Sequence, residues 1–572
     1  MSGSGLNIRK KRILFCSEAT FLNTGYATYT REILNYLHGT GKYEIAEMAS
    51  YGERNDSRAA NIPWTYYGVM PNQQSEPKAS QQEIDAYNSN GVNQFGEWIF
   101  EHVCLDFLPD VVCDIRDFWM LDFAERSPFR NYFKWAIMPT VDARPQARQW
   151  IASYENADAC FTYSDWAGGI LEDQSGGKIN YLGSAPPSAH PAYKPFEDKR
   201  QLRLENGLDV SSKIIGTVMR NQRRKLYPDL FAAFRKFLDL QRAKGYTDPC
   251  YLYCHTSYPD LGWDIPELLQ QYELASHVLF TYICPDTKKP FPSVFKGAIA
   301  QSPYTKKWGA TLSNVKNGAS YEDLSQIMNY FDLYVQYANC EGFGLPQVEA
   351  AACGVPVMGT DYSAMESVLR KLEGFPIKPA ALYKELETGC LRAVPDNDLA
   401  AQMFEEFFEK SDDERAAIGQ KTRENFEKHY QWHLSGAKWE AYFDSIELLP
   451  IEATWASQPK IHESKPKPEQ APEIPHAELA RWLIVEVLGD PSKLNTFFEA
   501  RLTRDLMYKS STASTGGMYF NESSQAFAGT GARESFDFNI AYDQMKAQCN
   551  RRNQWEQRRF ETMKQRNIIN GT

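Results

Sequence analysis

The 572-residue sequence lacks the long apolar runs and the closely spaced cysteine pairs that mark two whole classes of protein. No apolar run approaches the roughly 18 residues that a membrane-spanning helix requires, so we expect no membrane span. The eleven cysteines are scattered from Cys16 to Cys549, and the one close pair, Cys250 and Cys254, has no second pair at metal-ligand spacing. This pattern predicts reduced thiols in a cytoplasmic protein rather than a disulfide scaffold or a zinc site.

The charge balance favours no particular class of partner. Lys and Arg total 62 and Asp and Glu total 73, which gives a formal net charge of −11. A uniformly acidic surface would repel DNA and anionic membranes, unless basic residues gather locally. Hydrophobic residues make up 43% and charged residues 24%, as in ordinary soluble globular proteins, and the length predicts three or four domains.

Short apolar runs alternate with amphipathic helical stretches in two successive blocks. The first block begins at Ile13 and the second near Lys213, and a proline-rich stretch over 184–191 separates them. Such alternation predicts parallel sheets covered on both faces, with ligands bound at the strand ends in a cleft. We therefore expect a flexible leader over 1–12, an N-terminal α/β domain over 13–190 and a C-terminal α/β domain over 191–430.

The composition changes after these two blocks. A helix over 431–449 is expected to pack back on the N-terminal domain, and six of the 26 residues over 450–475 are proline, which predicts an extended linker. A helical segment is predicted over 476–508, a flexible stretch rich in Ser, Thr, Gly and Ala over 509–535, and a basic helical tail over 536–572. With Trp555 among its arginines, this tail could hold nucleic acid or dock on a protein.

The most informative stretch begins at Glu341 and reads EGFGLPQVEAAACGVPV. Two carboxylates, Glu341 and Glu349, flank a glycine-rich turn that opens a helix. The N–H groups of Phe343, Gly344 and Leu345 would point at an anionic ligand, and Glu349 can accept hydrogen bonds from vicinal hydroxyls. The alternative is that both carboxylates merely cap the helix or lie on the surface.

This stretch closely resembles the signature of retaining GT-B glycosyltransferases, the glycogen-synthase and sucrose-synthase-like group (glycosyl transferases group 1, family 4-like). The run from Gly216 to Lys225 resembles the donor-phosphate segment of that family, and the loop around Gly25 corresponds to its N-terminal loop. The similarity extends, with gaps, from about residue 13 to 446. It implies a GT-B fold, in which two Rossmann-like domains face a cleft, here followed by a mainly helical C-terminal extension.

The resemblance also implies roles for individual residues. Arg220 and Lys225 would neutralise the diphosphate of a nucleotide sugar such as a UDP-sugar, with Arg223 and Arg224 as nearby substitutes. Glu341 would contact the transferred sugar, and Glu349 the ribose. The backbone of Phe343, Gly344 and Leu345 would support the sugar and phosphate oxygens, while the loop at Gly25 would face the donor phosphates.

The family is thought to retain configuration by front-face attack with the leaving phosphate as base, so no protein nucleophile, cofactor or metal is expected. The alternative for residues 220–225 is a solvated basic loop.

Three regions depart from the family pattern. Many relatives carry two glycines where this chain has only Gly25, and a His-Asp pair where it reads Pro139-Thr-Val-Asp142. Asp142 is a candidate for positioning the acceptor, the alternative being a structural turn before Pro145. The segment 284–318 is longer than is typical of the family, and we assign no role to it. Asp396-Asn-Asp398 matches a metal-binding DxD motif, but a helix-capping turn is the favoured interpretation.

The acceptor is open at this stage. Some phage enzymes of this kind modify hydroxymethylated DNA bases, which makes modified DNA in a host cytoplasm one hypothesis. Surface polysaccharide, a lipid-linked sugar and a protein are others. A non-catalytic nucleotide-sugar-binding protein is the alternative class.

Overall fold

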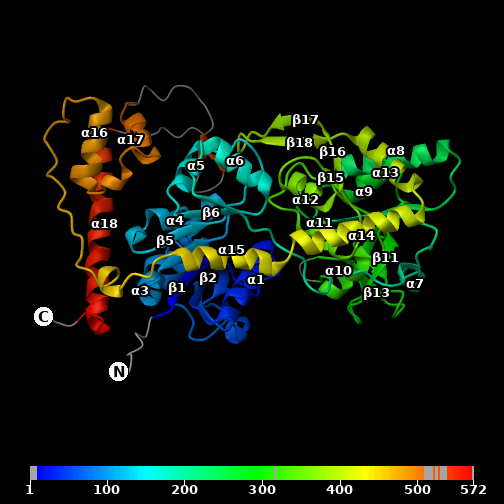
Figure 1. Cartoon of the computed structure of the whole chain (residues 1–572), viewed down its shortest axis with the longest axis horizontal. Helices are drawn as coiled ribbons and strands as arrows, with labels where there is room; N and C mark the ends of the chain where they lie inside the picture. The colour runs from blue at the N-terminus through cyan, green and yellow to red at the C-terminus, as the bar shows by residue number, and fades with distance from the viewer. Residues whose placement is uncertain (1–8, 315–316, 508–518, 522–525, 529–536, 570–572) are drawn as a thin grey trace, which may run out of the picture.

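The computed structural model describes residues 9–314, 317–507, 519–521, 526–528 and 537–569. Two sheets lie side by side with helices on their faces, and a mainly helical extension lies beyond the first sheet, on the side away from the second (Figure 1). The predicted fold class, two α/β domains and a helical C-terminal extension, is confirmed. Among the described residues, no helix is both long and apolar enough to cross a bilayer.

The N-terminal domain is built on a seven-stranded parallel sheet in the order β3-β2-β1-β4-β5-β6-β7. Its strands are β1 (Lys11–Glu18), β2 (Tyr43–Glu53), β3 (Thr65–Met70), β4 (Val111–Asp114), β5 (Lys134–Ile137), β6 (Ala159–Thr162) and β7 (Tyr181–Ser184). Its helices are α1 (Gly25–Thr40), α2 (Gln81–Asn88), α3 (Phe100–Phe107), α4 (Phe118–Arg126), α5 (Arg148–Glu155) and α6 (Asp165–Ser175).

Local sequence explains the ends of α1. The Thr24 hydroxyl caps the first turn by accepting a hydrogen bond from the Ala27 N–H at 3.3 Å, and Gly41 ends the helix in the left-handed conformation. Apolar residues at three- and four-residue spacing then turn one face of the helix toward the sheet. The predicted leader over 1–12 is too long, because Arg9 forms two 2.7 Å hydrogen bonds to Asp110 and β1 begins at Lys11.

The C-terminal domain contains a nine-stranded sheet whose main path is β12-β13-β10-β9-β8-β14-β15-β16, with β11 paired to β10. Its strands are β8 (Lys213–Val218), β9 (Cys250–His255), β10 (Val278–Ile283), β11 (Pro290–Val294), β12 (Ile299–Gln301), β13 (Trp308–Leu312), β14 (Leu333–Gln336), β15 (Val357–Thr360) and β16 (Phe375–Ile377); β17 (Pro379–Lys384) and β18 (Leu391–Pro395) form a separate hairpin. Its helices are α7 (Lys199–Glu205), α8 (Tyr227–Ala243), α9 (Ile265–Gln271), α10 (Tyr321–Met328), α11 (Leu345–Ala352), α12 (Ala364–Leu372), α13 (Asn397–Glu409) and α14 (Asp412–His429).

After α14 the chain returns to the first domain through α15 (Trp432–Ser445). Trp439 is fully buried there, with its ring centroid 5.9 Å from that of Phe15 and 4.2 Å from that of Phe161, and its indole N–H donates to the Tyr29 hydroxyl at 3.0 Å. This packing buries a large aromatic surface against the N-terminal sheet. The end of the C-terminal domain is therefore attached to both sheets.

The extension consists of α16 (His476–Trp482), a π-helical turn (Leu483–Leu488), α17 (Phe497–Met507), the short strands β19 (Tyr519–Asn521) and β20 (Ala526–Ala528), and α18 (Phe538–Gln565). The helical segment predicted over 476–508 consists of two parts in the structure, because Gly489 ends the first part in the left-handed conformation. Most of the flexible stretch predicted over 509–535 lies outside the described residues.

The basic helix α18 packs against the N-terminal domain through its own arginines. Arg559 is fully buried and contacts the Glu556 carboxylate at 2.8 Å, and Glu556 also accepts a 2.7 Å hydrogen bond from the Tyr132 hydroxyl. Arg551 pairs with Glu101 at 3.2 Å, and Arg566 pairs with Asp106 at 2.8 Å. Trp455, in the proline-rich linker, is buried beside the same surface, so that segment is partly docked on the domain.

Arg559→Ala should destabilise the protein by about 3–5 kcal/mol, because it leaves the buried Glu556 carboxylate without its cation. Urea unfolding followed by tryptophan fluorescence measures this loss. Arg558→Ala is the matched control, since Arg558 lies over the Trp555 ring at the surface and its loss should cost about 1 kcal/mol or less. Equal losses in the two variants would contradict the structural role of Arg559.

Candidate active site

The strand order of the second sheet reverses between β8 and β14, and such a reversal opens a crevice at the carboxyl ends of the strands. The chain leaves β8 toward β9 and β10 on one side, while β14 is followed by β15 and β16 on the other. The two loops at the reversal are 219–226, after β8, and 337–344, after β14. A β-bridge between Lys225 and Ala338 joins them.

These two loops bring three predicted site residues together. Lys225 forms an ion pair with one oxygen of the Glu341 carboxylate, and Arg224 pairs with the other oxygen at 2.5 Å. The Gln336 amide donates to Glu341 Oε1 at 2.7 Å, and the Glu341 N–H donates to the Ser363 hydroxyl at 2.9 Å. The sequence alone did not decide between Arg224 and Lys225, and the structure places both against Glu341.

Burial sets the electrostatics of this cluster. Lys225 is 7% exposed and Glu341 is 4% exposed, whereas Arg224 extends into solvent. Burial lowers the pKa of the Lys225 ammonium, the neighbouring Arg224 lowers it further, and the direct contact with Glu341 opposes both effects. Two cations and one carboxylate leave an excess positive charge at the base of the crevice, where an anion would be attracted.

Arg220 lies apart from that cluster. Its guanidinium makes a two-pronged contact with Asp260, with distances of 2.8 and 3.0 Å, and remains half exposed. The hydrogen bond from Arg220 lowers the pKa of Asp260 to about 2. Arg220 thus stands at the rim of the crevice with a partner that the sequence analysis did not anticipate.

The glycine-rich turn leads directly into α11. Gly344 has a φ of 85° and a ψ of 56°, in the left-handed region that favours glycine, and α11 begins at Leu345. Pro346 has no N–H, and the Gln347 N–H donates to the Gly344 carbonyl at 3.1 Å, so the Leu345 N–H is the first-turn donor available to an anion. Glu349 lies in the next turn and is buried. Burial raises the pKa of Glu349 to about 7, and the nearby Tyr193 hydroxyl opposes that rise.

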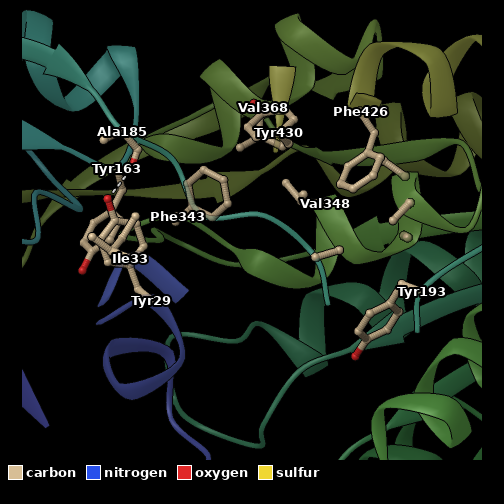
Figure 2. Close-up of a cluster of buried hydrophobic side chains, with 14 of the residues drawn as sticks. Tyr29, Ile33, Tyr163, Ala185, Tyr193, Phe343, Val348, Val368, Phe426 and Tyr430 are labelled. Carbon is tan, nitrogen blue, oxygen red and sulfur yellow. Dashed lines mark hydrogen bonds between the residues drawn. The ribbon is translucent and has the colours of Figure 1, made fainter. Parts of the chain in front are cut away.

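The Phe343 side chain has a structural part in this turn. Figure 2 shows it between aromatic residues of the N-terminal domain, among them Tyr163, and Tyr430 of the chain's return segment. The ring centroids of Phe343 and Tyr430 lie 5.9 Å apart in an edge-to-face arrangement. The ring therefore helps to close the interface beneath the crevice, while the backbone of the same residue remains at the helix start.

The first sheet has its own reversal of strand order, between β1 and β4, and a second polar cluster lies there. The Tyr26 hydroxyl donates to Asp117 at 2.8 Å and lies 2.6 Å from the Thr140 hydroxyl. Burial raises the pKa of Asp117 to about 6. These three residues were not singled out from the sequence, although Asp117 follows the apolar strand at 111–114, which is the signal that points to it. Gly25 begins α1 beside Tyr26, and a side chain added at Gly25 would meet open space.

The two domains touch across the crevice. A Cβ added to Gly342 would lie 2.5 Å from the Thr140 methyl carbon, so this close approach requires glycine. Asp142 also reaches the other domain, since its carboxylate accepts a 3.0 Å hydrogen bond from Arg392 and a 3.3 Å hydrogen bond from the Cys340 thiol. Asp142 therefore does more than shape a turn: it links the N-terminal domain to the residue that precedes Glu341.

Asp396 and His255 have local structural roles. Asp396 caps α13 by accepting 3.0 Å hydrogen bonds from the Asp398 and Leu399 N–H groups, which confirms the capping interpretation. His255 bonds to the Thr281 hydroxyl at 3.0 Å, and burial lowers its pKa to about 4. Within the described residues, no group of three or more His, Cys, Asp or Glu side chains is arranged to hold a metal ion.

Two facing α/β domains, the first built on a parallel sheet and the second on a mixed sheet with a parallel centre, have the GT-B class of fold. Comparison with solved structures agrees. Sucrose-phosphate synthase from Thermosynechococcus elongatus aligns with a TM-score of 0.53 and 15% identity, over 76% of this chain and 98% of that one. Anabaena Alr3699/HepE in complex with UDP-glucose aligns with a TM-score of 0.51 and 12% identity, over 76% of this chain and all of that one.

Sequence comparison identifies the domain that carries Glu341 and Glu349. Residues 313–424 match the family "Glycosyl transferases group 1". Sucrose synthase 1 from Oryza sativa subsp. japonica is 30% identical over 133 residues, a match that spans 22% of this chain and 14% of the rice protein. Residues 313–424 are thus similar to the glycosyl transferases group 1 family, and the two α/β domains together have a GT-B fold.

Glu349→Gln should change how stability depends on pH. The folded state raises the pKa of Glu349 from about 4.5 to about 7, so its contribution to stability is fully present below pH 4.5 and is lost as the pH rises through 7. Between pH 4.5 and 8, the wild type should lose about 3 kcal/mol relative to the variant in urea unfolding. Glu424→Gln, at an exposed position of α14, should follow the wild type. A constant difference between wild type and Glu349→Gln would refute the raised pKa.

Proposed function

We propose that this protein is a glycosyltransferase that moves a sugar from a nucleotide-diphosphate sugar, such as a UDP-sugar, to an acceptor hydroxyl. The observation that carries the proposal is the convergence of Lys225, Arg224 and Glu341 at the strand reversal of the second sheet. The start of α11 adds the Leu345 backbone N–H as a donor at the same place. Anabaena HepE, which shares the fold, was solved with UDP-glucose, and the same type of donor fits this charge arrangement.

The donor would lie with its diphosphate against the cations and its sugar toward Glu341. As the bond between the anomeric carbon and the diphosphate breaks, negative charge accumulates on the leaving phosphate. Lys225 and Arg224 would stabilise that charge, the kind of electrostatic contribution that is usually the largest in such transfers. Arg220, half exposed at the rim, can reach the donor only by giving up its contact with Asp260. The buried Glu349 would bind the ribose hydroxyls.

Retention of configuration follows from the family resemblance and is part of the proposal. In front-face attack, the acceptor oxygen bonds to the anomeric carbon on the side that the diphosphate leaves, and the departing phosphate takes the acceptor's proton. The bond to the diphosphate breaks as the new glycosidic bond forms, so the step needs no protein nucleophile. Placing the acceptor beside the leaving phosphate is the protein's main task.

The polar cluster of the N-terminal domain is the place we assign to the acceptor. Tyr26, Asp117 and Thr140 face the Glu341 loop across the contact between Thr140 and Gly342. The Asp117 carboxylate can accept a hydrogen bond from an acceptor hydroxyl. Asp142 pairs with Arg392 of the C-terminal domain. We propose that Asp142 helps to place the acceptor by holding the 139–142 loop against that domain.

Modified DNA remains one proposed acceptor, with polysaccharide, lipid-linked sugar and protein as others. The expected DNA contact through the basic tail is weakened by the structure, because Arg551, Arg559 and Arg566 pair with carboxylates of the protein itself. A non-catalytic nucleotide-sugar-binding protein is less well supported, since both the cations and the carboxylates of the site are present together.

Arg224→Ala should weaken UDP binding about 10- to 100-fold, because removing one charge-assisted hydrogen bond costs about 1.5–3 kcal/mol. Isothermal titration of the full-length protein with UDP measures the change. Lys236→Ala, which removes an exposed lysine of α8 paired with Asp398, should bind UDP as the wild type does. A wild type that binds neither UDP nor another nucleoside diphosphate at millimolar concentration would refute the proposed function.

Asp117→Asn should leave UDP affinity unchanged and reduce sugar transfer at least tenfold to any acceptor found by screening with the preferred donor. The amide keeps the shape of the carboxylate but loses its charge, so its hydrogen bond to an acceptor hydroxyl weakens. Comparing transfer with slow donor hydrolysis in water separates acceptor binding from donor activation. Equal loss of both reactions would place Asp117 outside the acceptor site.

A further inference from the structure

Residues 284–313, which follow β10, form a basic surface that the proposed reaction does not use. This segment contains five lysines and one acidic residue, Asp286, although the whole chain is acidic. All five lysines are exposed: Lys288, Lys289, Lys296, Lys306 and Lys307. Long, charged side chains on ordered strands and turns are a fixed positive patch rather than a diffuse tail.

Four of these lysines lie on two adjacent turns, which we call the lysine turns: 284–289, between β10 and β11, and 302–307, between β12 and β13. The Tyr304 hydroxyl of the second turn donates to the Pro290 carbonyl beside the first at 2.7 Å. Lys307 lies 3.6 Å from the Asp286 carboxylate of the first turn. Strand pairing thus gathers charges that are up to 19 positions apart in the sequence.

Two aromatic rings accompany the lysine turns at the surface. Tyr304 is 44% exposed, and its ring is held by the hydroxyl contact to Pro290 and by an edge-to-face contact with Phe291, at 5.9 Å between centroids. Trp308, at the start of β13, is 71% exposed. Exposed rings beside lysines, one of them held in a fixed orientation, form a stacking platform for bases along a phosphate backbone.

The position of the lysine turns connects them with the crevice. The first turn leaves the carboxyl end of β10, and β8, β9 and β10 run parallel, so this turn lies at the same edge of the sheet as the loop that carries Arg224 and Lys225. Only β9 separates β10 from β8. A polymer held on the lysine turns would therefore run beside the donor site.

We propose that the lysine turns, together with Tyr304 and Trp308, bind single-stranded nucleic acid, with lysines on phosphates and bases stacked on the rings. The rigid Tyr304 ring favours this partner over a membrane surface, which needs an apolar face to insert rather than an ordered stacking plane. If the bound nucleic acid is the sugar acceptor, the inference rests on the proposed glycosyltransferase function. The binding of nucleic acid to the lysine turns does not depend on that function.

The test is fluorescence anisotropy of a labelled 30-nucleotide DNA strand with the full-length protein, titrated at several salt concentrations without any nucleotide sugar. Affinity should fall steeply with salt, because each phosphate contact releases counterions. Lys306→Ala/Lys307→Ala should reduce the slope of log affinity against log salt by about 1–2. Trp308→Ala should weaken binding at least about fivefold through lost stacking. Lys421→Ala/Lys428→Ala, on exposed positions of α14, is the matched control and should behave as the wild type.

Binding that is absent at low salt, or equally reduced in the control, would overturn the proposal. So would binding to vesicles containing anionic phospholipid in preference to the DNA strand. UDP titration of the same variants keeps the two proposals apart: the lysine-turn variants should retain wild-type UDP affinity. A wild type that does not bind UDP would count against glycosyl transfer, but it would leave the conclusion on nucleic-acid binding unchanged.

Discussion

The ion pair between Lys225 and Glu341 joins the two loops at the strand reversal of the second sheet, and the arrangement of the site depends on it. Burying two charges costs several kcal/mol per ion before their attraction is counted, so such a pair adds little net stability. Here Arg224 and the Gln336 amide complete the contacts of the Glu341 carboxylate and leave one cation in excess, while the Ser363 hydroxyl accepts from the Glu341 backbone N–H. The excess positive charge at this point is the basis of the proposed donor site.

The same loop also determines how closely the two domains approach. Gly342 has no side chain where the Thr140 methyl group lies, and Phe343, one residue on, fills the space beneath. Arg392 of the C-terminal domain also pairs with Asp142 of the N-terminal domain. Because these contacts come from residues adjacent to Glu341, the packing of the interface and the placement of the proposed donor and acceptor clusters are parts of one structure.

Net charge conceals two opposite uses of basic residues. In α18, Arg551, Arg559 and Arg566 pair with Glu101, Glu556 and Asp106, so part of the positive charge of this basic helix is matched by carboxylates of the protein itself. The lysines of 284–313 face solvent and have few acidic neighbours. The composition of α18 therefore overstates the positive charge that a partner could contact. The net charge of −11, in contrast, hides the positive charge of residues 284–313.

Much of the fold could be predicted from the sequence, because the spacing of apolar residues and the choice of turn residues determine structure locally. The alternation of strands and helices, the cap of α13 and the glycine-rich start of α11 are of this kind. β2 is hard to recognise from the sequence because its buried Glu47 interrupts the apolar pattern, and the helices of the extension are divided at one left-handed glycine, Gly489.

The sequence indicated the fold class through its family resemblance, and it indicated the residue types of the proposed donor site through the spacing of Glu341, Glu349 and the basic run at 220–225. The folded structure was needed to show which cations contact Glu341, that Arg220 pairs with Asp260, and that Tyr26, Asp117 and Thr140 form one cluster. These contacts join residues from separate strands, and chain spacing carries no information about which loops a strand reversal brings together.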